Sequence, residues 1–176
     1  MKFQELKTEI LKRAKEANAC EGPYKLAYKS KTKKALFEIV KEEFSWCYSN
    51  GVIDSDLLDD AFGERYVNEN GIYYKGEIDR IEGKEVIALC GNVVIGVLDS
   101  STVQGMWDSS TVQEMLGSST VQGMWDSSTV QEMWDRSTVR SNNGKKPEKM
   151  EGNRFSFIDY SNNVIICGSD FKIKKK

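Results

Sequence analysis

The sequence predicts an α+β protein, in which a small helical N-terminal domain precedes a short right-handed β-solenoid. Three observations support this fold class. Apolar residues in the first 65 positions recur at three- and four-residue steps. Apolar, strand-like clusters separated by glycines follow, and valine then recurs every nine residues between residues 99 and 139. The predicted domains are therefore residues 1–65, which are helical, and residues 66–176, which form the solenoid.

Three helices are predicted in the first domain. The first covers about residues 3–17, where the apolar residues share one helix face. Residues 18–23 supply helix breakers and a turn. The second helix covers about residues 32–48, and Asn50-Gly51 suits a left-handed C-cap after it. Asp54 can cap a short third helix that the next glycine ends.

Residues 66–98 change from a helical to a strand period. Ile72–Tyr74 and Glu85–Leu89 are predicted strands with glycines between them. Residues 85–98 are interpreted as a degenerate unit that caps the array, because terminal repeats protect an otherwise exposed core. In this alignment Val94 falls on Val103, nine residues later.

The regular repeats occupy residues 99–139. They read DSSTVQGMW, DSSTVQEML, GSSTVQGMW, DSSTVQEMW and DRSTV. The Ser-Ser-Thr-Val segment is poor helix sequence, whereas β-branched residues between Asp-Ser turns suit short strands joined by bends. Valine and methionine are the expected inward residues, and threonine and glutamine are expected to point outward.

The residue after each glutamine alternates between glycine and glutamate. Two interpretations stay open. Either the coil has two nine-residue faces and a true period of two units, or the alternation only records how the repeats were duplicated. We favour the two-faced, 18-residue coil, in which glycines stack on one face and glutamates on the other. Gly96 contradicts the alternation, because the alignment places it beside Gly105.

The chain after the array is predicted to close the solenoid. Residues 140–152 are polar and are expected to form a loop. Phe155–Ile158 and Val164–Cys167 are apolar and β-prone, and they fall in a second capping unit, residues 153–173. The final lysine-rich residues are expected to be solvated.

Charge is distributed unevenly along the chain. The net charge is −2, but residues 99–135 contain six acidic and no basic side chains, and residues 136–176 contain ten basic and four acidic ones. These segments either attract each other within the molecule or form a charged binding surface. No apolar run is long enough to span a membrane, and the charged residues 1–9 do not resemble a secretory signal, so we expect a cytoplasmic protein.

The residue inventory argues against catalysis and metal binding. The chain has no histidine, and its four cysteines form no CxxC pair, so we expect reduced thiols, no metal site and no cofactor. Glu114 and Glu132 are the available carboxylate pair, but near-identical repeats would give both the same environment, which acid–base chemistry cannot use. The repeats also lack the glycine pattern of calcium-binding nonapeptides. We expect no catalytic residue and no enzyme activity.

The run STVQxMW resembles the tandem STV/ATV-type repeat proteins of gut bacteria and their phages. Residues 11–20, LKRAKEANAC, and the later FSWC and GVID segments are similar to the short helical region that precedes the repeats in that group. The resemblance covers most of the chain. It implies a bacterial or mobile-element setting, and it implies no activity and no functional residues.

We therefore expect a non-enzymatic binding protein whose repetitive solenoid surface engages a partner protein. The resemblance suggests a phage or mobile-element factor that acts on a host defence or regulatory protein. The alternative is a carbohydrate-binding module with a tryptophan ladder, if the tryptophans are exposed; we favour their burial at a coil corner. Neither nucleic acid nor membrane is an expected partner, and the sequence defines no oligomeric state. The expected binding residues are Gln104, Gln113, Gln122, Gln131, Glu114, Glu132, Trp107, Trp125 and Trp134.

Overall fold

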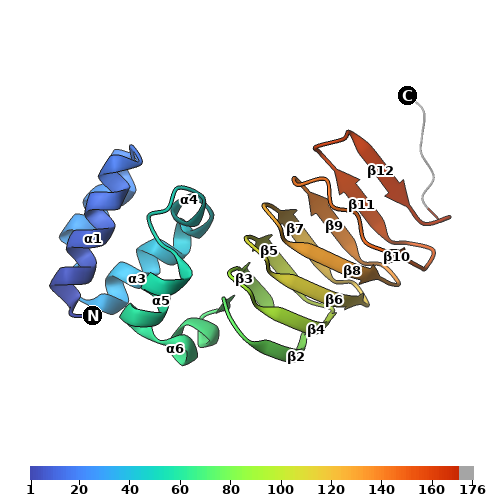
Figure 1. Ribbon diagram of the computed structural model, residues 1–176, viewed down its shortest axis with the longest axis horizontal. Helices are drawn as coiled ribbons and strands as arrows, with labels where there is room; N and C mark the ends of the chain where they lie inside the picture. Colours follow the sequence, from blue (N-terminus) through green and yellow to red (C-terminus); the bar gives the residue numbers. More distant parts are fainter. Residues whose placement is uncertain (171–176) are drawn as a thin grey trace. The chain divides into compact units, whose positions relative to one another are not determined.

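The computed structural model describes residues 1–170, which divide into two compact units. Met1–Asn70 form a helical unit, and a parallel β-solenoid of about five turns begins at Gly71 (Figure 1). The predicted α+β class is confirmed. The division along the chain follows Asn70, whereas the sequence predicted a domain boundary after residue 65. No helix within residues 1–170 combines the length and the apolar character that crossing a membrane requires.

Within residues 1–70 the structure has six helices. They are α1 (Phe3–Glu16), α2 (Glu21–Lys29), α3 (Lys33–Glu42), α4 (Phe44–Ser49), α5 (Ser55–Phe62) and α6 (Glu64–Glu69). The apolar face predicted for α1 is buried. The Asp54 side chain caps α5 by accepting a 2.7 Å hydrogen bond from the Leu57 N–H, and Gly63 ends this helix at φ 77°. Helix α6 was not predicted, because its sequence ERYVNE contains no apolar stripe.

Two predictions about the helices need correction. Residues 18–23 were expected to form a turn, but α2 begins at Glu21. Pro23 is tolerated there because the first turn of a helix leaves its N–H groups without helical partners. The second predicted helix is divided at Glu43, whose φ of −105° and ψ of 24° separate α3 from α4.

The strands of residues 71–170 form two sheets. The seven-stranded sheet has the order β1-β3-β5-β7-β9-β11-β12, and the five-stranded sheet has the order β10-β8-β6-β4-β2. Figure 1 shows odd- and even-numbered strands as the two walls of the solenoid. The strands are β1 (Ile72–Tyr73), β2 (Glu77–Glu82), β3 (Glu85–Leu89), β4 (Val94–Asp99), β5 (Thr102–Met106), β6 (Thr111–Leu116), β7 (Thr120–Met124), β8 (Thr129–Met133), β9 (Thr138–Ser141), β10 (Lys149–Met150), β11 (Ser156–Asp159) and β12 (Val164–Cys167).

The register of the parallel strands establishes an 18-residue coil. Val112 on β6 pairs with Val130 on β8, and on the other wall Val103 on β5 pairs with Val121 on β7. Each coil therefore uses two nine-residue units, one for each sheet. The two-faced coil is confirmed, with the glycines of the array on the seven-stranded sheet and its glutamates on the five-stranded sheet.

The predicted alignment of the first, degenerate unit is wrong by one residue. Ile95 pairs with Val112, so the coil between them is one residue shorter than the regular coil that joins Val112 to Val130. Ile95 therefore occupies the valine position that was assigned to Val94. Gly96 falls at the glutamine position, so it does not break the alternation of glycine and glutamate.

Strands β2 and β10 were missed in the sequence. The segment of β2, EIDRIE, is mostly charged, but Ile78 and Ile81 have the three-residue spacing that valine and methionine have in the four complete units. Strand β10 lies within the predicted loop of residues 140–152. It pairs with β8 and so completes the five-stranded wall.

Each wall contributes one column of stacked valines and one column of stacked methionines to the core. The methionines of the regular array are fully buried, as are all its valines except Val130, which is 3% exposed. At the far end Phe157 on β11 closes the core with 1% exposure, and β12 then pairs antiparallel with β11. The two predicted closing segments are thus strands, and residues 171–173 of the predicted cap lie outside the described part of the chain.

Candidate binding surface

The corners of the coil place one residue per unit in the left-handed backbone region. Asp108, Asp126 and Asp135 have φ values of 53°, 51° and 57°, and Gly117 has φ 63°. Aspartate and glycine are among the residues that tolerate this conformation best. The backbone of the corner therefore explains why the last four units begin with aspartate or glycine; in the first unit Ser100, at φ 47°, holds the left-handed position.

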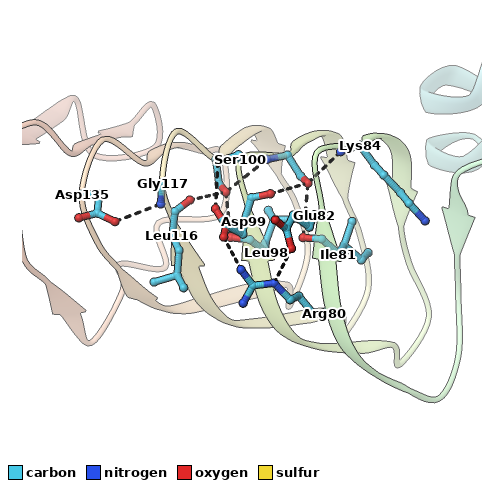
Figure 2. Close-up of polar contacts among 12 residues, drawn as sticks. Arg80, Ile81, Glu82, Lys84, Leu98, Asp99, Ser100, Leu116, Gly117 and Asp135 are labelled. Carbon is cyan, nitrogen blue, oxygen red and sulfur yellow. Dashed lines mark hydrogen bonds and ion pairs between the residues drawn. The ribbon is translucent and has the colours of Figure 1, made fainter.

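The corner aspartates also connect successive coils. The Gly117 N–H donates to the Asp135 carboxylate at 3.1 Å, and the Gly91 N–H donates to the Asp108 carboxylate at 2.9 Å. Each carboxylate thereby satisfies a backbone amide that the sheet ladder does not use. Figure 2 shows the contact between Gly117 and Asp135.

One corner joins the array to the coil that precedes it. The Arg80 guanidinium forms ion pairs with Asp99 and, at 3.0 Å, with Glu82. The Ser100 hydroxyl donates to the same Asp99 carboxylate at 2.9 Å. In Figure 2 these side chains cluster beside Leu116 and Gly117 of the next coil. Asp99 therefore stabilises the corner where the first regular unit begins.

The serine that precedes the threonine of every unit is buried, a feature that sequence reasoning missed. These serines are Ser101, Ser110, Ser119, Ser128 and Ser137. The Ser119 hydroxyl lies 2.6 Å from the Leu116 carbonyl and 2.8 Å from the Leu98 carbonyl of the preceding coil. The signal was present in the sequence, because a serine that never varies between units indicates a fixed hydrogen bond.

The five-stranded sheet carries the charged face of the array. Glu114 and Glu132 pair directly on β6 and β8, and Gln113 and Gln131 precede them on the same strands. Both glutamines and Glu114 are exposed, and Glu132 is half-buried. We call these four residues the acidic face.

Basic residues lie at both ends of the column that contains the two glutamates. Arg80 pairs with Val97, Val97 with Glu114, and Glu132 with Lys149. The column therefore runs positive, apolar, negative, negative and positive across the sheet. Because Asp99, Asp108, Asp126 and Asp135 hold the corners, the glutamates supply the acidic charge of the array that faces outward from a strand.

The seven-stranded sheet has a different outer face. Gln104 and Gln122 are exposed on it, but glycine replaces glutamate, and a tryptophan ring lies over each glycine. The rings of Trp107 and Trp125 stack with centroids 5.0 Å apart and planes 11° apart. Trp107 is only 3% exposed. This pair packs as a covered layer outside the valine–methionine core.

The third tryptophan has different neighbours. The Trp134 Nε1–H donates to Glu132 at 3.2 Å, and the Lys149 ammonium lies 4.1 Å from the ring centroid. Trp134 and Trp125 are half-buried. The expectation of burial is therefore met for Trp107 and only in part for the other two rings. The structure thus separates the nine expected binding residues into two groups on opposite walls.

Comparison of the chain with protein-family models, with curated proteins and with solved structures finds no match. Within residues 1–170, no group of three or more Cys, Asp or Glu side chains is arranged to hold a metal ion. The geometry of the two walls is therefore the feature of the molecule that bears on its function.

Proposed function

We propose that this protein is a non-enzymatic binding protein, and that its acidic face engages a basic segment of a partner protein. One observation carries the proposal: Glu114 and Glu132 lie directly opposite each other on neighbouring strands. Like charges in this position destabilise a sheet. A lysine or arginine from a partner would relieve that repulsion and would gain two charge-assisted hydrogen bonds.

The glutamines next to these glutamates support the same partner chemistry. The amides of Gln113 and Gln131 can both donate and accept hydrogen bonds, so they suit the polar groups of a peptide backbone. The coil holds all four side chains at strand spacing on a rigid wall, and this lowers the entropy cost of binding. With the resemblance to phage and gut-bacterial repeat proteins, we propose a cytoplasmic setting and a host defence or regulatory protein as the target.

The contacts of the tryptophans favour a protein over a carbohydrate. A sugar-stacking platform needs an open indole face. Trp107 and Trp125 cover each other, and Lys149 lies over the ring of Trp134. The acidic face would also repel the phosphates of a nucleic acid.

Affinity capture with matched variants tests the proposal. The immobilised full chain is incubated with bacterial lysate, and bound proteins are compared between wild type, E114Q/E132Q and Q104A/Q122A. The first variant removes the charge from the acidic face, and the second alters the opposite wall as a control. We expect one partner to be lost with E114Q/E132Q and retained with Q104A/Q122A, and its binding to weaken as salt rises. A partner retained by both variants, or lost with both, would contradict the assignment to the acidic face.

A glycan titration tests the alternative directly. Tryptophan fluorescence is measured while soluble oligosaccharides are added to the intact protein. We expect no change in intensity or emission maximum, because Trp107 is buried and the stacked partner covers one face of Trp125. A saturable change that W125A abolishes would favour the carbohydrate-binding module and overturn the present proposal.

A further inference from the structure

The helical unit contains an apolar cavity of about 130 Å³. Its floor is formed by side chains that are themselves buried. They come from four helices and the segment after α4, and they are Ile10, Ala14, Ala27, Val40, Cys47 and Val52. The cavity is thus part of the core of the unit, and the helices do not close over it.

Two of the alanines that line the cavity are buried. Ala14 on α1 and Ala27 on α2 are both 7% exposed, and each lines the cavity where a larger apolar side chain would fill it. Protein cores are normally packed to the density of organic crystals. A void of this size in so small a unit therefore costs stability that leucine at either position would restore.

The mouth of the cavity differs from its floor. Cys20 and Glu43 line it and are exposed, and Tyr24 and Trp46 are half-buried beside them. The thiol of Cys47 lies on the floor, where burial and, to a lesser extent, the Glu43 carboxylate raise its pKa to about 12. The floor is therefore uncharged at neutral pH, and the one carboxylate of the lining is at the opening.

We propose that this cavity is a binding site for a small, neutral, predominantly apolar molecule with the size of a single aromatic ring. Cavities of closely similar volume, about 150 Å³, stay dry and bind benzene when their lining is apolar. Water is a poor occupant, because it needs two to four polar partners and the floor offers little beyond a thiol. A ring N–H or O–H directed to the mouth can donate to Glu43, so heteroaromatic or phenolic ligands fit better than benzene itself.

Calorimetry and thermal unfolding of the full chain test the site, with benzene, phenol and indole as probes. We expect saturable binding and a rise in the melting temperature of the helical unit, with phenol or indole binding more tightly than benzene. Substitution of Ala27→Leu should weaken binding by at least about tenfold, because the added carbons fill the volume. Ala35→Leu, the same change at an exposed position of α3 outside the lining, should leave binding unchanged.

A second readout locates the ligand if A27L fails to fold. Nuclear Overhauser effects from the bound probe to the methyl groups of Ile10, Val40 and Val52 should appear in the wild-type protein, and Ala14→Leu should abolish them. The inference is overturned if no probe binds at millimolar concentration. It is equally overturned if binding survives both filling substitutions, or if the effects arise from methyl groups of the solenoid.

Discussion

Gly123 lies beneath the indole ring of Trp125, so closely that a β-carbon at position 123 would come within 2.1 Å of ring atom Cη2. We predict that Gly123→Ala lowers the free energy of unfolding of the solenoid by about 1–3 kcal/mol, because the ring must leave its place on the sheet. In a W125A background the same substitution should cost much less. Chemical denaturation of the four proteins gives this double-mutant cycle. Equal costs in both backgrounds would show that the glycine has another role.

The buried serines provide an internal comparison. Ser119 contacts two main-chain carbonyls, whereas the Ser137 hydroxyl, buried equally, has no hydrogen-bond partner among the described residues. Ser119→Ala should destabilise the protein by about 0.5–1.5 kcal/mol, because it removes a buried hydroxyl that contacts main-chain carbonyls of two successive coils. Ser137→Ala should be neutral or stabilising. Urea denaturation monitored by circular dichroism distinguishes the two, and a matching loss in both would contradict the assignment of their hydroxyl contacts.

The corner aspartates predict an order of substitutions at position 135. Asp135→Ala should cost about 0.5–1.5 kcal/mol, because it removes the acceptor of the Gly117 N–H, and the left-handed backbone adds strain. Asp135→Asn should retain most of the stability, since asparagine accepts the same hydrogen bond and tolerates the same φ. Asp135→Gly should fall between them. Melting temperatures of the three variants check this order, and an alanine variant as stable as the asparagine variant would refute it.

The two-walled coil predicts how the array responds to a change in length. Deletion of residues 109–126 removes one 18-residue coil and leaves every later strand on its own wall. Deletion of residues 109–117 instead moves each later strand to the opposite wall, so glutamates enter the glycine column and the closing strands lose their sites. We expect the longer deletion to give a cooperative thermal transition and the shorter one to lose it. A cooperative, equally stable nine-residue deletion would contradict the register.

The N-cap of α5 predicts a pH dependence in the helical unit. Burial acts to raise the pKa of Asp54, but the hydrogen bond from the Leu57 N–H and the contacts of Arg13 outweigh it and lower that pKa below its ordinary value. Stability from this group is therefore present above the unfolded pKa of about 3.9 and is lost as pH falls through the lower, folded value. Asp54→Asn keeps a capping side chain and should remove this part of the acid sensitivity. Helical circular dichroism between pH 6 and 2 compares the two proteins, and identical profiles would exclude Asp54 as a source.

The nine-residue period made the solenoid predictable. A strand that lacks this period, such as β2, was not predicted. Valine at every ninth position indicates stacked strands, and the glycine–glutamate alternation indicates two walls. Strand β2 lacks both signals, because charged residues fill its outward positions and its coil is one residue shorter than the regular ones. The predicted helix is divided at Glu43, where the sequence carries no helix-breaking residue.

The sequence predicted which residue types form the candidate site, but it did not predict which of these residues share a wall. Glutamine follows the inward valine, so the alternation of a strand points it outward, as observed for Gln113. Glu114 is exposed as well, although it lies two residues after Val112, so alternation alone does not predict its direction. Trp125 and Trp134 have different surroundings for two reasons. Their units belong to opposite walls, and the residue two positions before each tryptophan differs. Where that residue is Gly123, the ring of Trp125 occupies the space that a side chain there would take; where it is Glu132, the indole N–H donates to its carboxylate.

Strand β12 has a consequence for how copies of this protein behave in crowded solution. A parallel solenoid is a one-dimensional template, because each coil presents at its end the pattern that the next coil needs. By reversing direction, β12 ends the seven-stranded wall with a strand of the wrong polarity. A second molecule cannot extend the parallel stack across that edge in register. We therefore expect this reversed strand to oppose end-to-end growth of stacked copies along the seven-stranded wall.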